Sequence, residues 1–215
     1  MQLVDILTCS VHQWCDDTFT KHLPEQKKNW TQLKRLNLYS QNFIQMIKQA
    51  LLGEFLYEAE NTRKLLNAIP DSALDYRPQP HLWSVGQLAS HIAEVYNWFN
   101  PTFNQDFFDM GGYKYDKGDI SKASNIVAKL EENIANAKKV LENADETKFL
   151  NTWHMQMGGQ DIMPAMPKIQ VVRGFLFNHL YHHRGELVAH LRASGNKVPG
   201  MYGPTYEESQ AMRAN

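Results

Sequence analysis

In four stretches of this chain the apolar side chains recur every three or four residues. The stretches cover 42–68, 85–99, a segment that begins at Ser121, and a segment from about Pro167 to Ser194. This period is typical of amphipathic α-helices, whose apolar stripe must be buried against other elements. No segment shows the alternation that several strands would need. The pattern therefore predicts an all-α protein in which four helices form a bundle.

Particular residues mark where these helices begin and end. Ser84, followed by Gln87, forms the pattern of a capping box at the start of the second helix. Pro101 is expected to end that helix, because proline interrupts a helix interior. We expect a long loop over 101–120 and an irregular, methionine-rich segment over 150–166.

The ends of the chain differ from its middle. The first forty residues show no sustained apolar stripe, so for 1–40 we expect an N-terminal extension of low order with at most short helices. The bundle is expected over 41–207, followed by a short C-terminal tail over 208–215.

Composition excludes several classes of protein. Apolar residues make up 43% of the chain, which argues against wholesale disorder, and 22 basic against 23 acidic residues give a net charge of −1. Such a balance is not expected of a nucleic-acid-binding protein. No apolar run approaches the roughly 20 residues of a membrane span, and Asp5 interrupts the one short apolar stretch where a secretory signal would lie. Cys9 and Cys15 are too few for a disulfide scaffold, so we expect a cytoplasmic protein.

Histidines on the expected helices are the candidates for chemistry. At about 100° per residue, His183 lies about 40° from His179, on the side of the last helix that faces the bundle, whereas His182 lies about 100° from His183. His91 points inward from the second helix. Three neutral imidazoles with an open position are typical of a catalytic zinc-type site. A single histidine among apolar residues is more often just hydrogen-bonded in a core, and we expect this of His190.

Four segments carry a resemblance to a known group of proteins. They are Tyr76-Arg77-Pro78, the run WSVGQLASHIA from Trp83, the run NHLYHHRGEL from Asn178, and the run GNKVPGMYGP from Gly195. Over 42–207 the chain resembles the DinB/YfiT-like superfamily of metalloenzymes. That resemblance implies a four-helix bundle with a divalent metal held by His91, His179 and His183. Glu186 stands where the family usually has glutamine, either as a carboxylate that orients an imidazole or as a solvated side chain.

The resemblance also suggests what the protein does. Members of the superfamily include thiol-dependent S-transferases and isomerases, so we expect a metal-dependent transferase that uses a low-molecular-weight thiol on a small electrophile. Imidazole ligands do not select the metal, and Zn, Ni or Fe would serve. One alternative is a metal-dependent hydrolase with Glu94 or Glu186 as its base. The other is a stress-related bundle that binds metal without catalysis.

The resemblance further implies a partner and an interface. Members of the superfamily often form dimers, so we expect a homodimer. We also expect the protein to bind a small-molecule substrate. On the last helix, Tyr181 and Val188 point away from the side of His179 and His183 and are candidates for the dimer surface. Arg184 also faces away from the histidines and is expected to make interhelical or interface contacts.

Overall fold

The computed structural model describes residues 23–214, and their side chains from residue 45 onward. The expected low order of residues 1–22, with Cys9 and Cys15, lies outside these described residues. The chain divides into two compact units, Met1–Phe43 and Ile44–Asn215. The described part of the first unit is helical, and the second unit holds all the other elements.

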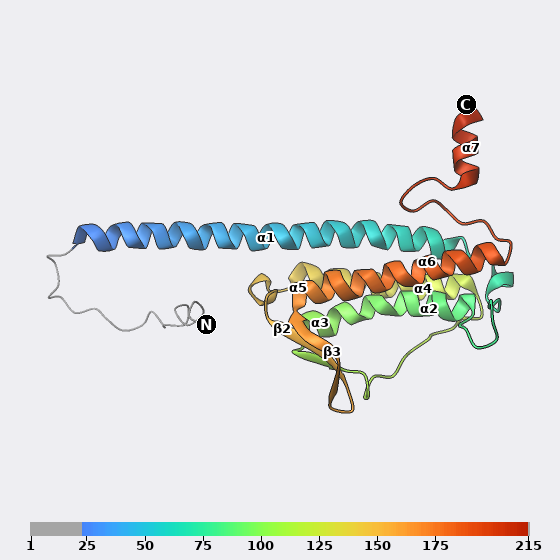
Figure 1. Cartoon of the computed structure of the whole chain (residues 1–215), viewed down its shortest axis with the longest axis horizontal. Helices are drawn as coiled ribbons and strands as arrows, with labels where there is room; N and C mark the ends of the chain where they lie inside the picture. Colours follow the sequence, from blue (N-terminus) through green and yellow to red (C-terminus); the bar gives the residue numbers. More distant parts are fainter. Residues whose placement is uncertain (1–22, 215) are drawn as a thin grey trace. The chain divides into compact units, whose positions relative to one another are not determined.

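The first helix begins earlier than its apolar stripe. We expected it over 42–68, but α1 extends over Leu23–Asn67 (Figure 1). The residues from 23 to 41 are rich in Leu, Lys and Gln, which favour helix without forming a stripe. Pro24 stands in the first turn, where a missing N–H costs no hydrogen bond. The prediction of at most short helices in this segment was therefore wrong, because periodicity detects only a face that is to be buried.

The second helix, α2, begins as its sequence indicates. It extends over Val85–Val95, and the backbone N–H of Gln87 donates to the hydroxyl of Ser84 at 3.3 Å. In return, the backbone N–H of Ser84 donates to the side-chain oxygen of Gln87 at 2.9 Å. The capping box is thus confirmed, and it fixes the start of the helix that carries His91.

Pro101 does not end this helical region as we expected. A short 3₁₀ turn, η2 (Tyr96–Trp98), leads directly into α3 (Phe99–Asn104). Pro101 is the third residue of α3, so its missing N–H falls in the first turn, where no intrahelical bond is lost.

The two later helices lie near their expected positions. The helix α4 extends over Ala123–Asn143. The last helical region begins with α5 (Lys168–Gln170), widens into the π-helical segment η4 (Val171–Phe177), and continues as α6 (Asn178–Ala193). We had expected one uniform α-helix over this region. His179 and His183 both lie in α6, the regular α-helical part, so they remain one helical turn apart. Short 3₁₀ turns follow α1 and α4, at Asp71–Ala73 and Glu146–Lys148.

A small sheet stands where we expected irregular chain. The strand β1 (Phe107–Asp109) pairs in parallel with β2 (Thr152–Met157), and β2 pairs antiparallel with β3 (Gln160–Pro167). Gly158 and Gly159 form the hairpin turn with φ of 60° and 79°, values that suit glycine at both positions. The fold is therefore mostly helical with a three-stranded sheet, and the prediction of a purely α protein was wrong here.

The hairpin was missed because its signal is weak. Its apolar positions are largely methionines, which have no marked strand preference, and Pro164 lies inside β3. Trp153 is nevertheless only 1% exposed, and its indole N–H donates to the carbonyl of Pro101 at 3.0 Å. This bond joins the sheet to α3.

The core of the second unit lies between the helices. The helix α2 packs against both α4 and α6, as Figure 1 shows, and α1 contributes its apolar face from Leu51 onward. Buried apolar side chains come from all four of these helices: Phe55, Leu65, Leu66, Leu88, Ile92, Leu130, Ile134, Leu180 and Leu187. The four-helix arrangement predicted from the stripes thus forms the body that carries the histidines.

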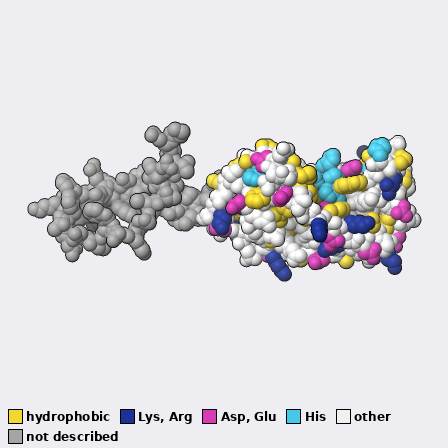
Figure 2. Space-filling model, turned by 90° about the horizontal axis from the view of Figure 1, so that it is seen from below, with side chains coloured by type: hydrophobic (Ala, Val, Ile, Leu, Met, Phe, Trp, Pro, Cys, Tyr) yellow, Lys and Arg dark blue, Asp and Glu magenta, His cyan; other side chains and the backbone are white. Residues whose placement is uncertain are grey.

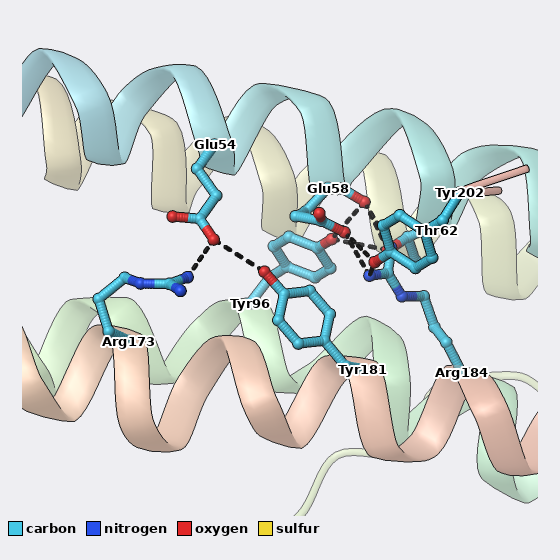
Figure 3. Close-up of polar contacts among 8 residues, drawn as sticks. All are labelled: Glu54, Glu58, Thr62, Tyr96, Arg173, Tyr181, Arg184 and Tyr202. Atoms are coloured by element: carbon cyan, nitrogen blue, oxygen red, sulfur yellow. Dashed lines mark hydrogen bonds and ion pairs between the residues drawn. The ribbon is translucent and has the colours of Figure 1, made fainter.

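A polar network joins α1 to α6 inside this body (Figure 3). Arg184, 1% exposed, donates to the carboxylate of Glu58 and, at 3.0 Å, to the Glu58 backbone carbonyl. The hydroxyl of Tyr202 donates to the same carboxylate at 2.6 Å. The hydroxyls of Thr62 and Tyr96 lie 2.8 Å apart beside them. Arg184 therefore makes the interhelical contact that we expected of it.

The face proposed for dimer contacts is partly covered within one chain. The hydroxyl of Tyr181 donates to Glu54 on α1 at 2.8 Å, and Arg173 pairs with the same carboxylate (Figure 3). Tyr181 and Val188 are both half-buried against the core. The homodimer stays a prediction.

The last described residues form a further short helix. It is α7 (Tyr206–Ala214), which begins two residues before the tail that we expected over 208–215. The carboxylate of Glu208 accepts the backbone N–H groups of Thr205 and Gly200, at 2.8 and 3.1 Å, and so holds the start of α7. From residue 23 to 214, none of the helices has the length and apolar character that crossing a membrane requires.

Candidate metal centre

Three histidines meet between α2 and α6. The Nε2 atom of His179 lies 2.9 Å from the Nε2 atom of His91 and 3.1 Å from that of His183. The ligand atoms of the three residues all lie within 4.8 Å of one another. The one-turn spacing of His179 and His183 brings both rings to the same side of α6, and α2 supplies the third. The structure thus brings together the three residues predicted from helical geometry.

Two carboxylates contact the Nδ1 atoms of His91 and His183, the ring nitrogens that do not face the other histidines. Nδ1 of His91 lies 3.1 Å from an oxygen of Glu94, and Nδ1 of His183 lies 3.0 Å from an oxygen of Glu186. A carboxylate can only accept, so we assign the ring hydrogen to Nδ1 in both histidines. Each Nε2 atom then carries a free lone pair. Of the two alternatives for Glu186, the structure shows the one in which it orients an imidazole.

The surroundings of His179 and His183 disfavour the charged form of both rings. Burial, followed by the neighbouring rings of His183 and His91, lowers the pKa of His179 to about 3. Burial also lowers the pKa of His183, although its bond to Glu186 acts in the opposite direction. A metal ligand must be a neutral imidazole, so these directions favour metal binding at neutral pH.

The donor set fits a divalent cation better than a hydrogen-bonded cluster. With Nδ1–H of His91 and His183 bound to carboxylates, neither ring has a hydrogen left on Nε2. His179 can donate one hydrogen at most, so the three converging Nε2 atoms cannot satisfy one another. Three lone pairs directed at one point are what a transition ion such as Zn²⁺ binds, with further positions open to substrate.

The other two histidines of α6 have different surroundings. His182 is exposed, and its ring centroid lies 4.8 Å from that of His183. It belongs to a separate candidate group with His183 and Glu186. His190 is buried, and its Nδ1–H donates to the carbonyl of Glu186 at 2.8 Å. It is therefore a core residue, as expected.

Aromatic rings surround the three histidines, and the sequence did not reveal them. The ring of Trp83 lies 4.8 Å from that of His91 and 5.9 Å from that of His183, while Tyr115 lies 6.2 Å from His91. Trp98 and Phe175 flank His179 at 5.2 and 5.3 Å. Figure 2 shows histidine and hydrophobic side chains side by side at the surface of one face. These rings come from separate loops and helices, so no local pattern marks them as a group.

Solved structures share this fold. A DinB-like protein from Bacillus cereus ATCC 10987 is 23% identical, with a TM-score of 0.55 over 72% of this chain and 97% of that one. YfiT from Bacillus subtilis, described as a probable metal-dependent hydrolase with an unusual four-helix bundle topology, is 17% identical. Its TM-score is 0.52 over 70% of this chain and 89% of YfiT. At these identities the likeness concerns the fold.

Sequence comparison is more specific. The uncharacterized protein YrdA of Bacillus subtilis (strain 168) is 28% identical over 158 residues, which are 73% of this chain and 89% of YrdA. The family model described as the DinB family matches residues 40–214, the part of the chain that holds all the candidate ligands. Since this match extends over well more than half of its length, the chain belongs to the DinB family.

Proposed function

We propose that this protein is an enzyme that depends on a divalent metal ion held by His91, His179 and His183. The observation that supports this most is the convergence of three Nε2 atoms, two of them on rings whose Nδ1 atoms bind carboxylates. When bound, such an ion supplies Lewis-acid chemistry, because it lowers the pKa of a thiol or water beside it. Imidazole donors suit Zn, Ni and Fe alike.

Within this proposal we favour a thiol as the nucleophile and S-transfer to a small electrophile as the reaction. The carboxylates of Glu94 and Glu186 bind Nδ1 atoms, and Nδ1 lies on a different side of the imidazole ring from Nε2. Both carboxylates are engaged with Nδ1 atoms, so they serve to orient the rings. Attack by water benefits from a base within hydrogen-bond reach, whereas a thiol, being far more acidic than water, loses its proton without one.

Hydrolysis is the second candidate. Its support is the description of YfiT, a structural neighbour, as a probable metal-dependent hydrolase. In that case water takes the place of the thiol, and neither Glu94 nor Glu186 serves as its base. A bundle that binds metal without catalysis is the third candidate. Such a protein would retain its metal ion but turn over no substrate.

Parallel assays on the zinc-loaded protein separate these candidates. One uses cysteine as the probe thiol and 1-chloro-2,4-dinitrobenzene as the electrophile: sulfur bonds to the ring carbon, chloride leaves with the bonding electrons, and the thiol proton goes to solvent. The other follows hydrolysis of p-nitrophenyl acetate without thiol. We expect thiol-dependent turnover that is lost in His91→Ala and kept in His182→Ala. Turnover of the ester alone would favour the hydrolase, and tight zinc retention with neither activity would favour the binding protein.

A further inference from the structure

We propose that the metal centre takes a substrate with a planar, apolar group, which lies against the rings of Trp83 and Tyr115. This inference rests on the proposed function, because it concerns what approaches the ion held by the three histidines. It adds a chemical class of substrate and two residues that select it. Two observations support it: exposed aromatic rings at the histidines, and a hydrogen bond that holds one of them in place.

The first observation is the exposure of Trp83. Its ring is nearly parallel to that of His183, with an interplanar angle of 24°, and meets the ring of His91 edge-on at 70°. Despite these contacts the side chain is 43% exposed. A large apolar side chain that remains open to solvent beside a candidate site is typical of a ligand-binding wall. With 43% of its surface open to solvent, the indole is accessible to a flat partner.

The second observation is the way in which Tyr115 is held. Its side chain is 44% exposed, and its ring lies 6.2 Å from that of His91. The hydroxyl of Tyr115 lies 2.9 Å from that of Ser90, which in turn donates to the carbonyl of Lys117 at 2.6 Å. Ser90 directly precedes His91 on α2, so this bond fixes the ring relative to the histidine. Two exposed aromatic rings thus stand next to the same imidazole.

Together the two rings favour a flat apolar group. Aromatic pairs add to the effect of buried area, so a ring laid against Trp83 and Tyr115 gains contacts that a small aliphatic group does not.

Two hydroxamic acids with the same metal-binding head test this directly. Benzohydroxamate carries a phenyl group and acetohydroxamate a methyl group, and calorimetry on the zinc-loaded full-length protein gives both dissociation constants. We expect benzohydroxamate to bind about tenfold more tightly than acetohydroxamate. In Trp83→Leu this ratio should fall to about two, with acetohydroxamate affinity nearly unchanged, and Trp83→Phe should restore most of it.

The controls separate this inference from the function on which it rests. Tyr206→Leu removes a 75% exposed ring on α7 and should leave the ratio as in the unmodified protein. If the unmodified protein takes up no zinc, the proposed function is wrong and this inference with it. If zinc and both hydroxamates bind but the ratio is near one, or if Trp83→Leu keeps the full ratio, only the inference is overturned.

Discussion

Arg184 and His183 are adjacent on α6, and their side chains leave the helix toward different neighbours. Arg184 binds Glu58 on α1 (Figure 3). His183 meets the other histidines on the side of α2. A buried ion pair tolerates little displacement, because separating the two side chains leaves an unpaired charge in the core. The pair therefore fixes the rotation of α6 about its axis, and with it the direction of His179 and His183.

Breaking this pair should cost much of the stability of the bundle. Arg184→Ala leaves the Glu58 carboxylate buried without its charged partner, and we expect a loss of about 3–5 kcal/mol in the free energy of unfolding. Urea denaturation followed by circular dichroism measures it. The matched control is Glu131→Gln, which breaks the more exposed Arg63–Glu131 pair and should cost about 0–1 kcal/mol. Similar losses in the two variants would contradict the role given to Arg184.

The carboxylates behind the histidines should tune metal affinity. Glu94→Gln replaces the acceptor at Nδ1 of His91 by an amide, and we expect zinc affinity to fall about 10–100-fold. Glu186→Gln should have a smaller effect, because the Glu186 side chain is 33% exposed against 4% for Glu94. Competition with a zinc-binding dye gives both constants. An unchanged affinity in Glu94→Gln would show that the carboxylate does not hold the ring.

Removing metal should lower the melting temperature. An ion that binds the folded state alone stabilises it by about 2.7 kcal/mol when its free concentration is 100 times the dissociation constant. We expect the purified protein to melt at a lower temperature after chelation and to recover when zinc is restored. Calorimetry before chelation, after it and after zinc addition checks this, and a melting temperature that does not respond would argue against a site in the folded protein.

The homodimer is a separate prediction. Light scattering at micromolar concentration should give a species of twice 24.9 kDa. A single species of 24.9 kDa would reject it. Because Tyr181 is partly covered by its bond to Glu54, a dimer that uses this face has less apolar surface available than the sequence alone suggests.

The sequence predicted those features that depend on local periodicity. The stripes located the four helices, and the capping residues Ser84 and Gln87 placed the start of α2. The spacing of His179 and His183 needs only the geometry of one helical turn, so their convergence with His91 followed once two inward faces were identified. Such inferences do not require knowledge of the tertiary structure.

Other features depend on contacts between distant segments. The hairpin of β2 and β3 is stabilised by pairing and by the burial of Trp153, and methionines give little local sign of it. Trp83 and Tyr115 reach the same histidine from two different loops. The ion pair of Glu58 and Arg184 joins residues 126 positions apart. In each case the partner is supplied by the fold, so a single sequence does not show it.

The central claim is that His91, His179 and His183 bind one metal ion, and His182 and His183 allow its sharpest test. The two residues are adjacent and chemically identical, but only the Nε2 atom of His183 meets that of His179, at 3.1 Å. Zinc content and affinity should be measured side by side on His182→Ala and His183→Ala, with circular dichroism to show that both fold. We predict a sharp loss of zinc in His183→Ala and near-native binding in His182→Ala. Equal loss in both variants, or loss in His182→Ala alone, would contradict the account.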